Sequence, residues 1–227
     1  MVTAIVLAAG RSTRMGGGPN KQFINLLGRP LLWYSLDAFE RSTSVDAVVV
    51  VRRPDYAGQA QQIVQVSGFK KIVALVDGGV ERQNSVWNGL EACDAATEIV
   101  AVHDGARPLT TPELIEATVA STRSHGTGIA ATKIVDTIKE ATPERTVERT
   151  VDRTKLWAVQ TPQTAQFRLL REAYGLVLKK NLVVTDEAAA IELLGRPVHL
   201  VETSFLNLKI TTPADLAVAE ALLRKRQ

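Results

Sequence analysis

The segment TAIVLAAGRSTRMGGGPNK, residues 3–21, decides the fold class of this chain. It opens with a short apolar run at residues 3–8, which predicts one buried strand. Small residues and glycines follow immediately, so the strand ends in a loop whose backbone a ligand can approach closely. Ligands of parallel sheets usually bind at the carboxyl ends of the strands. The segment therefore predicts a central strand and a binding loop at its end.

Strand patterns and helix patterns alternate along the following residues. Buried parallel strands are predicted from runs rich in Val and Ile at residues 47–51, 71–75 and 99–103. Helices are predicted between them, at residues 31–41, 56–67, 83–95 and 112–125. This alternation predicts an α/β fold in which a mostly parallel, twisted sheet is flanked by helices on both faces. Right-handed crossovers then bring the carboxyl ends of the strands to one edge.

The alternation breaks at about residues 135–160. Two extended stretches there flank a polar turn that contains Pro143, which favours a projecting β-arm over a plain surface loop. Beyond the arm, helices are predicted at residues 166–178, 186–194 and 213–226, and a strand at residues 198–203. No repeat or linker divides the chain, so we expect a single domain over residues 1–227 that carries the arm.

Composition excludes several classes of protein. With 227 residues, 45% of them hydrophobic, the chain can bury a full core, and a net charge of +3 does not require nucleic acid as a partner. The single cysteine, Cys93, cannot form an internal disulfide and is expected as a packed thiol. We find no zinc pattern, targeting segment or apolar stretch of about 20 residues, so we expect a cytoplasmic protein without a membrane span.

The first loop carries two cations, Arg14 and Lys21, that can converge on one anionic ligand. Before them, Ala8, Ala9 and Gly10 permit close backbone approach, and consecutive amides there can form an anion-binding nest. The loop matches neither GxxxxGK[ST] nor GxGxxG. A glycine-rich surface turn with solvated charges is the structural alternative, but the position directly after the first strand favours a phosphate site.

Two further loops follow predicted strands. The first contains Gly78 and Gly79 and leads to Ser85 at a helix start, which suits a base or ribose, although an ordinary glycine turn with a helix cap explains it equally well. The second places Asp104 at the end of a central strand, where a carboxylate beside phosphates is a candidate Mg²⁺ ligand. Arg107 could hold that carboxylate or touch substrate, and a purely structural Asp–Arg pair is the alternative.

Taken together, the motifs resemble one family, the 2-C-methyl-D-erythritol 4-phosphate cytidylyltransferases of the non-mevalonate isoprenoid pathway. Each motif alone is weak, but they occur in the family's order and cover nearly the whole chain. They are AAG at 8–10 with Arg14 and Lys21, DGG at 77–79 with Ser85, VHDGARP at 102–108, DTIK at 136–139, TVDR at 150–153, QTPQ at 160–163, TDEA at 185–188 and KIT at 209–211.

This resemblance implies a Rossmann-like fold of the nucleotide-diphospho-sugar transferase type and the transfer of a cytidylyl group from CTP to methylerythritol phosphate. It also implies Mg²⁺ at Asp104 and a homodimer with interlocking arms, whose residues serve the neighbour's site. The implied nucleotide contacts are Ala8, Ala9, Gly10, Gly79, Ser85, Asp104 and Gly105. The implied transition-state cations are Arg14 and Lys21, and the acceptor would be held by Arg107, Thr137, Arg153, Thr161, Thr185 and Lys209. Arg153 and Lys209 also count as catalytic because they position the acceptor.

The chain departs from the family's usual residues at Ser12, Val80 and Gly105, where glycine, an acidic residue and alanine are common. These departures leave room for a related acceptor, ribitol 5-phosphate. Two alternatives belong to other classes: a regulatory nucleotide-binding domain and a dinucleotide-dependent dehydrogenase. The retained cations and Asp104 argue against the first, and the absence of GxGxxG argues against the second.

Overall fold

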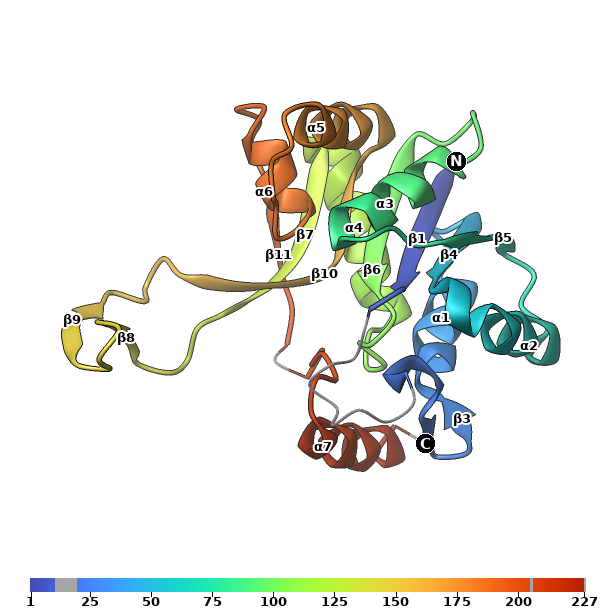
Figure 1. The fold of residues 1–227 in the computed structure, drawn as a ribbon, viewed down its shortest axis with the longest axis horizontal. Helices are drawn as coiled ribbons and strands as arrows, with labels where there is room; N and C mark the ends of the chain where they lie inside the picture. The colour runs from blue at the N-terminus through green and yellow to red at the C-terminus, as the bar shows by residue number, and fades with distance from the viewer. Residues whose placement is uncertain (11–19, 205, 227) are drawn as a thin grey trace.

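A seven-stranded sheet forms the centre of the computed structural model, which describes residues 1–10, 20–204 and 206–226 (Figure 1). The strands lie in the order β11-β7-β10-β6-β1-β4-β5. Their bounds are β1 Val2–Ala8, β4 Ala47–Arg52, β5 Ile72–Asp77, β6 Ile99–Asp104, β7 Thr127–Lys133, β10 Trp157–Gln166 and β11 Leu200–Glu202. Strand β10 runs antiparallel to β6 and β7, while the other pairs in the sheet are parallel. The predicted Rossmann-like, mostly parallel sheet is thus confirmed.

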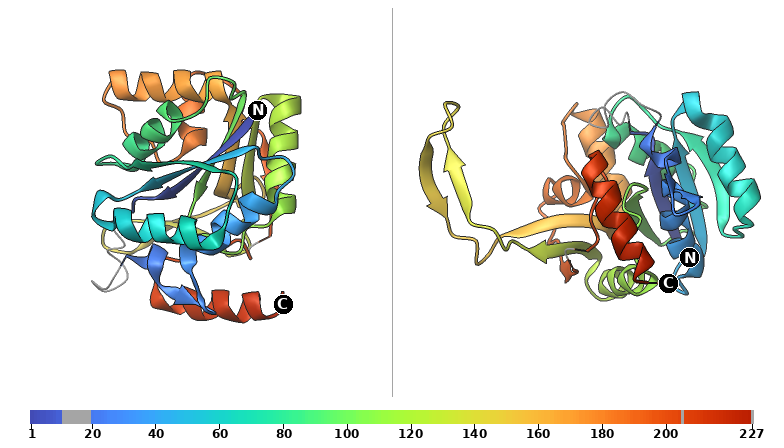
Figure 2. Two further views of the ribbon diagram at one scale, coloured as in Figure 1. Left: turned by 90° about the vertical axis from the view of Figure 1, so that its right-hand side faces the viewer. Right: turned by 90° about the horizontal axis from the view of Figure 1, so that it is seen from below.

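Strand β1 organises the core because both of its faces are buried. Its even-numbered residues pack against α1 (Leu31–Arg41) and α4 (Pro112–His125), together with Ile63 of α2 (Ala57–Ser67). Its odd-numbered residues Ile5 and Leu7 face α3 (Arg82–Glu91), α5 (Phe167–Lys179) and α6 (Glu187–Glu192). Helices therefore cover both faces of the sheet, as Figure 2 shows.

A third apolar cluster seats the last helix, α7 (Pro213–Arg224), beside the loop after β6. In it, Ala219 and Leu223 of α7 pack with Ala106 and Leu109. The small hairpin of β2 (Asn25–Leu26) and β3 (Arg29–Pro30) contributes Leu26 to this cluster, and it follows the 3-10 helix η2 (Lys21–Phe23) in the chain. Another 3-10 turn, η3 (Pro54–Tyr56), leads into α2.

The arm contains a two-stranded hairpin of β8 (Ile138–Ala141) and β9 (Val147–Val151). Strands β7 and β10 extend out of the body toward it, and the hairpin projects well beyond the rest of the molecule (Figures 1 and 2). Strand β10 begins at Trp157, so the last residues of the range predicted for the arm are paired with β7 in the main sheet.

The sequence predicted most element positions but missed β7 and β10. Strand β10 escapes detection because Gln160, Thr161, Gln163 and Thr164 are all buried in it, so it lacks the apolar pattern of a core strand. Helix α3 ends at Glu91 rather than at residue 95, and α6 and β11 are shorter than predicted.

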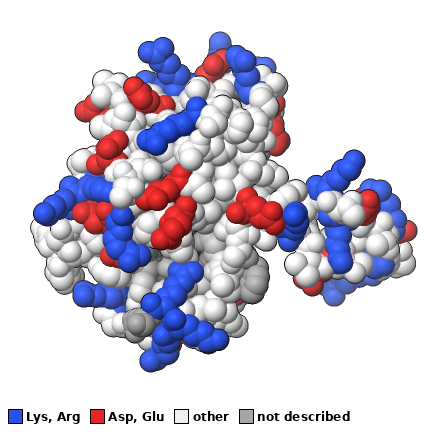
Figure 3. Space-filling model, turned by 180° about the vertical axis from the view of Figure 1, so that it is seen from behind, with Lys and Arg blue, Asp and Glu red and all other residues white. Residues whose placement is uncertain are grey.

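The face shown in Figure 3 carries side chains of both signs, in keeping with a net charge of +3. Within the part of the chain that the structure describes, every helix is too short or too polar to cross a bilayer.

Cys93 is half-buried, and we expect it to react about 10³-fold more slowly with a thiol reagent at pH 8 than an exposed cysteine does. Burial raises the pKa of its thiol to about 12, which leaves very little of the reactive thiolate. The thiol also donates to the Gly89 carbonyl, at 3.3 Å. Labelling with a chromogenic disulfide checks this: the chain unfolded in guanidinium should react quickly, and an equally fast native protein would contradict a packed thiol.

Candidate active site

A cleft of about 570 Å³ opens at the carboxyl edge of the sheet, where the loops after β1, β5 and β6 meet. This volume lies in the usual range of small-molecule sites. Seven of the residues predicted for the site line it: Ala9, Gly10, Lys21, Gly79, Ser85, Asp104 and Lys209. Loops separated by up to 200 residues in the sequence thus contribute to one site, as the parallel topology requires.

Four other predicted residues lie just behind the cleft. Ala8 is buried at the end of β1, and Arg107 and Thr161 are buried beside Asp104. Gly105 faces the interior, since a Cβ there would lie 2.7 Å from Leu32 Cδ1. These residues can shape the site from below rather than present a side chain to its opening.

The remaining predicted residues lie elsewhere. Thr185 is exposed on the segment before α6, and Thr137 and Arg153 are exposed on the arm. Arg153 donates to the Val135 carbonyl at the base of the arm. Arg14 and the departure at Ser12 lie outside the described residues, so the role of Arg14 stays a prediction.

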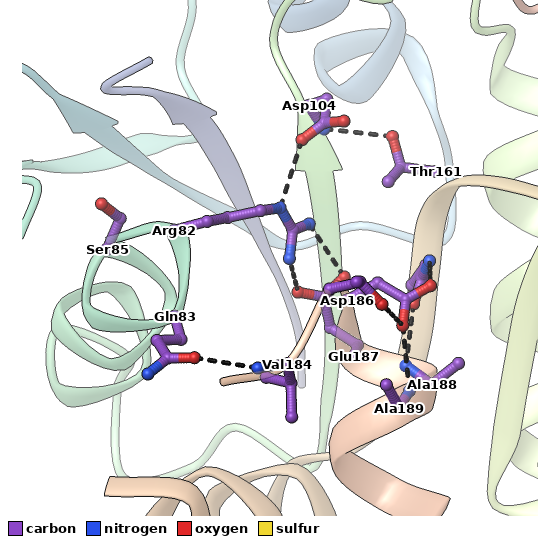
Figure 4. A network of polar contacts seen from close by, with 12 residues as sticks. Arg82, Gln83, Ser85, Asp104, Thr161, Val184, Asp186, Glu187, Ala188 and Ala189 are labelled. Carbon is purple, nitrogen blue, oxygen red and sulfur yellow. Dashed lines mark hydrogen bonds and ion pairs between the residues drawn. The ribbon is translucent and has the colours of Figure 1, made fainter. Parts of the chain in front are cut away.

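Asp104 is surrounded by three cations. Its Oδ1 lies 3.6 Å from Arg82 Nε (Figure 4). Its Oδ2 lies 2.7 Å from Lys209 Nζ and 4.0 Å from Arg107 Nε. Burial alone would raise the pKa of this carboxyl, but the charges of Arg82 and Lys209 outweigh it and hold the pKa well below its ordinary value. The site therefore contains a permanently ionised carboxylate within a positive surround, which suits a polyanionic ligand.

Arg82 lines the cleft and contacts Asp104, and the sequence analysis did not single it out. Its Nη1 and Nη2 atoms donate to both oxygens of Glu187, at 2.7 and 3.0 Å, and Tyr174 donates a third hydrogen bond to Glu187 at 2.9 Å. Glu187 is fully buried. Burial disfavours the charge on Arg82, but Glu187 and Asp104 overcome it and raise the pKa of Arg82 well above its ordinary value. Arg82 lies between the DGG motif and Ser85 in the sequence, but nothing in its spacing indicated this bridge.

Lys21 is positioned by the 3-10 helix η2, of which it is the first residue. Asn20 caps η2, accepting a hydrogen bond from the amide of Gln22 at 3.1 Å. The Lys21 ammonium is buried and donates to the Ile210 carbonyl at 2.6 Å. Because Lys209 precedes Ile210, one short segment brings the two lysines to the same part of the cleft.

The glycine loop after β5 is held by Ser85. The Ser85 hydroxyl accepts from the Gly79 amide at 3.1 Å and donates to the Glu81 carbonyl at 3.2 Å. A Cβ at Gly78 would lie only 2.4 Å from the Cβ of Ala9, so the β1 and β5 loops touch without room for another side chain. Gly78, which we expected to allow close approach of a ligand, thus also allows the neighbouring loop to pack against it.

Asp104 can contribute one carboxylate to a metal site, and the other ligands of the metal would have to come from the substrate and from water. Among the described residues, no group of three or more His, Cys, Asp or Glu side chains could hold an ion. Mg²⁺, however, commonly takes one or two carboxylates and draws its other ligands from phosphate oxygens and water. Asp104, ionised and lining the cleft, fits such a metal arriving with a triphosphate.

His103 does not supply a general base to this site. It is fully buried, and burial lowers its pKa to about 3. Its Nδ1 lies 3.1 Å from Thr161 Oγ1, and its ring packs edge-on against Phe39. The ring is therefore a neutral packing element below the cleft.

A mostly parallel sheet with a basic, glycine-bordered cleft at its carboxyl edge defines a nucleotidyltransferase of the α/β class. The family model described as IspD, 2-C-methyl-D-erythritol 4-phosphate cytidylyltransferase, matches residues 2–225. The chain belongs to this family.

Individual members of the family match this chain over nearly its whole length and theirs. The chain is 44% identical to the 2-C-methyl-D-erythritol 4-phosphate cytidylyltransferase of Pelotomaculum thermopropionicum, over 100% of this chain and 95% of that one. It is also 44% identical to the enzyme of the same name from Geobacillus kaustophilus, over 98% and 97%. The crystal structure of 4-diphosphocytidyl-2C-methyl-D-erythritol synthase from Anaerococcus prevotii superposes with a TM-score of 0.87, at 32% identity, over 98% and 96% of the two chains.

Proposed function

We propose that this chain transfers the cytidylyl group of CTP to 2-C-methyl-D-erythritol 4-phosphate and releases pyrophosphate, a step in isoprenoid precursor biosynthesis. Full-length membership of the family supports this. The observation that carries it is the cleft in which Lys21 and Lys209 meet the glycine loops after β1 and β5 around Asp104. The relatives named above act on methylerythritol phosphate by name, which favours this acceptor over ribitol 5-phosphate. A cytoplasmic location stays a prediction.

In this mechanism a phosphate oxygen of the acceptor attacks the α-phosphorus of CTP in line. A new phosphorus–oxygen bond forms, the bond from the α-phosphorus to the α–β bridging oxygen breaks, and pyrophosphate leaves with that electron pair. An ionised phosphate is already a nucleophile, so the chain must position two anions and neutralise charge rather than supply a strong base. The positive charge of Lys21 stabilises the negative charge that develops on the α-phosphate, and that of Arg14 stabilises the departing β- and γ-phosphates.

The nucleotide occupies the side of the cleft bordered by Ala9 and Gly10, with Ala8 buried behind them, and by the Gly79 loop that Ser85 holds. Asp104 would hold Mg²⁺ carried by the triphosphate, and the ion would neutralise phosphate charge when bound. Arg82 and Arg107 keep the Asp104 carboxylate ionised and fixed in place. Because Gly105 has no side chain, the backbone behind this carboxylate packs closely against Leu32.

Lys209, which lines the cleft, contacts the acceptor, and Thr185 and residues of the arm also hold it. Arg107 and Thr161, buried beside Asp104, support the acceptor side of the cleft from below. We propose a homodimer in which Thr137 and Arg153 serve the partner's cleft. Both are exposed on the projecting arm and neither lines the cleft of its own chain, which supports this arrangement.

Replacing Arg153 with alanine should raise KM for the acceptor about 10- to 100-fold and change KM for CTP little, because a charge-assisted contact to one substrate is lost. Steady-state kinetics with each substrate varied in turn measures this. Arg149→Ala is a matched control, since Arg149 is exposed on the same arm and pairs with Glu140 at 2.5 Å. An equal rise in both KM values would remove the proposed role of Arg153.

The function itself is tested by pyrophosphate release. Purified protein with Mg²⁺ is offered CTP or UTP and a panel of acceptors that includes methylerythritol phosphate and ribitol 5-phosphate. We expect release only with CTP and methylerythritol phosphate together. Preference for ribitol 5-phosphate, or no release with any pair, would contradict the proposal.

A further inference from the structure

Two glutamine side chains hold the segment that carries Thr185. On its amino-terminal side, Gln83 donates from Nε2 to the Leu182 carbonyl at 2.9 Å. It also accepts from the Val184 amide at 3.1 Å (Figure 4). A side-chain amide that both donates to and accepts from one backbone stretch fixes that stretch as a strand partner would. Residues 182–184 are thereby tied to the first turn of α3.

On its carboxyl-terminal side, Gln163 does the same. It donates to Asp186 Oδ2 at 3.0 Å and accepts from the Ala188 amide at 3.0 Å. Asp186 in turn caps α6 by accepting from the Ala189 amide at 2.9 Å. Thr185 lies between the two glutamines, and its exposed hydroxyl is 3.5 Å from Asp186 Oδ1. The position of Thr185 therefore depends on how firmly the backbone on either side is held.

The first turn of α3 also holds the nucleotide side of the site. Arg82, the neighbour of Gln83, joins Asp104 to Glu187, and Ser85 fixes the Gly79 amide. Gln83 is half-buried and, unlike Arg82 and Ser85, does not line the cleft. One helical turn thus touches the nucleotide loop through Ser85 and the Thr185 segment through Gln83.

We infer that Gln83 is a positioning residue for the acceptor: it holds residues 182–184 so that Thr185 faces the acceptor in the correct place. This inference rests on the proposed function, which assigns Thr185 to the acceptor. Gln83 acts through the backbone of the segment and not through contact with either substrate.

The test is Gln83→Met, which keeps the length of the side chain and removes both hydrogen bonds. We expect KM for methylerythritol phosphate to rise about tenfold, the effect of losing two hydrogen bonds of ordinary strength, while kcat and KM for CTP stay within about twofold. Amide hydrogen exchange at Val184 should become faster in the same variant. Gln65→Met, an exposed glutamine on α2, is the matched control and should change neither.

Gln83→Glu separates the two hydrogen bonds. Its carboxylate can still accept from the Val184 amide but cannot donate to the Leu182 carbonyl, so we expect a KM for the acceptor between those of wild type and Gln83→Met. Unchanged KM in Gln83→Met, or an equal rise for both substrates, overturns the inference while an active wild type leaves the proposed function standing. An inactive wild type overturns the proposed function, and the acceptor role of Gln83 with it.

Discussion

The Lys21→Ala enzyme should turn over about 10²- to 10³-fold more slowly than wild type, because one preorganised cation facing the reacting phosphate is lost. Lys21 is buried at the cleft and anchored to the Ile210 carbonyl, so its charge is held in place before substrate arrives. Single-turnover measurement of pyrophosphate release, with CTP and acceptor saturating, isolates the chemical step from binding.

Lys71→Ala provides the matched control. The Lys71 ammonium also donates to a backbone carbonyl at 2.6 Å, that of Ser42, but it lies just before β5 begins, at the opposite edge of the sheet from the cleft. Both variants lose a similar hydrogen bond, and only Lys21→Ala loses a cation at the site. Normal turnover in Lys21→Ala, or an equal loss in Lys71→Ala, would remove Lys21 from the mechanism.

The second large effect concerns stability. Arg82→Met should lower the free energy of unfolding by about 3 kcal/mol or more, because Glu187 is then a fully buried carboxylate without a cation. For a chain of this length, such a loss corresponds to a decrease in Tm of about 6–12 °C. Urea unfolding of the wild type and the variant, followed by circular dichroism, measures the difference.

The double variant Arg82→Met with Glu187→Gln identifies the cause. It removes both charges yet keeps an oxygen that can accept from the Tyr174 hydroxyl, which now donates to Glu187 at 2.9 Å. We expect the double variant to recover a large part of the loss, since replacing a whole buried ion pair costs far less than breaking it. A double variant no more stable than Arg82→Met would show that lost packing, not the unpaired charge, causes the effect.

The sequence predicts those elements whose burial is apolar. Residues 31–41 and 112–125 are helices as predicted, and β1 differs from its prediction only by one residue at its start. Strand β10 could not be found in this way, because its buried Gln163 is satisfied by Asp186 and Ala188, and such partners are known only once the chain is folded. Long-range pairing, not local pattern, makes this strand possible.

The same distinction applies to the site. Asp104 and Lys21 follow strand ends, so position alone indicated them, and the order of motifs added Lys209. Arg82 could not be found, because its role depends on Glu187, a residue 105 positions away that is fully buried. Thr137 and Arg153 came from resemblance alone, and a single chain leaves them on the arm.

The contact between Gly78 and Ala9 constrains how this cleft can be redesigned. Because a methyl group added at Gly78 would overlap that of Ala9, the two positions share the space of a single side chain. A library that varies them one at a time would reject every larger residue at Gly78, even one that suits a new nucleotide. Trimming Ala9 to glycine first would remove the closest of these overlaps, and the Ser85 hydroxyl, which a Cβ at Gly78 would approach to 2.9 Å, would still have to shift. The order in which substitutions are introduced therefore decides which pocket shapes directed evolution can reach.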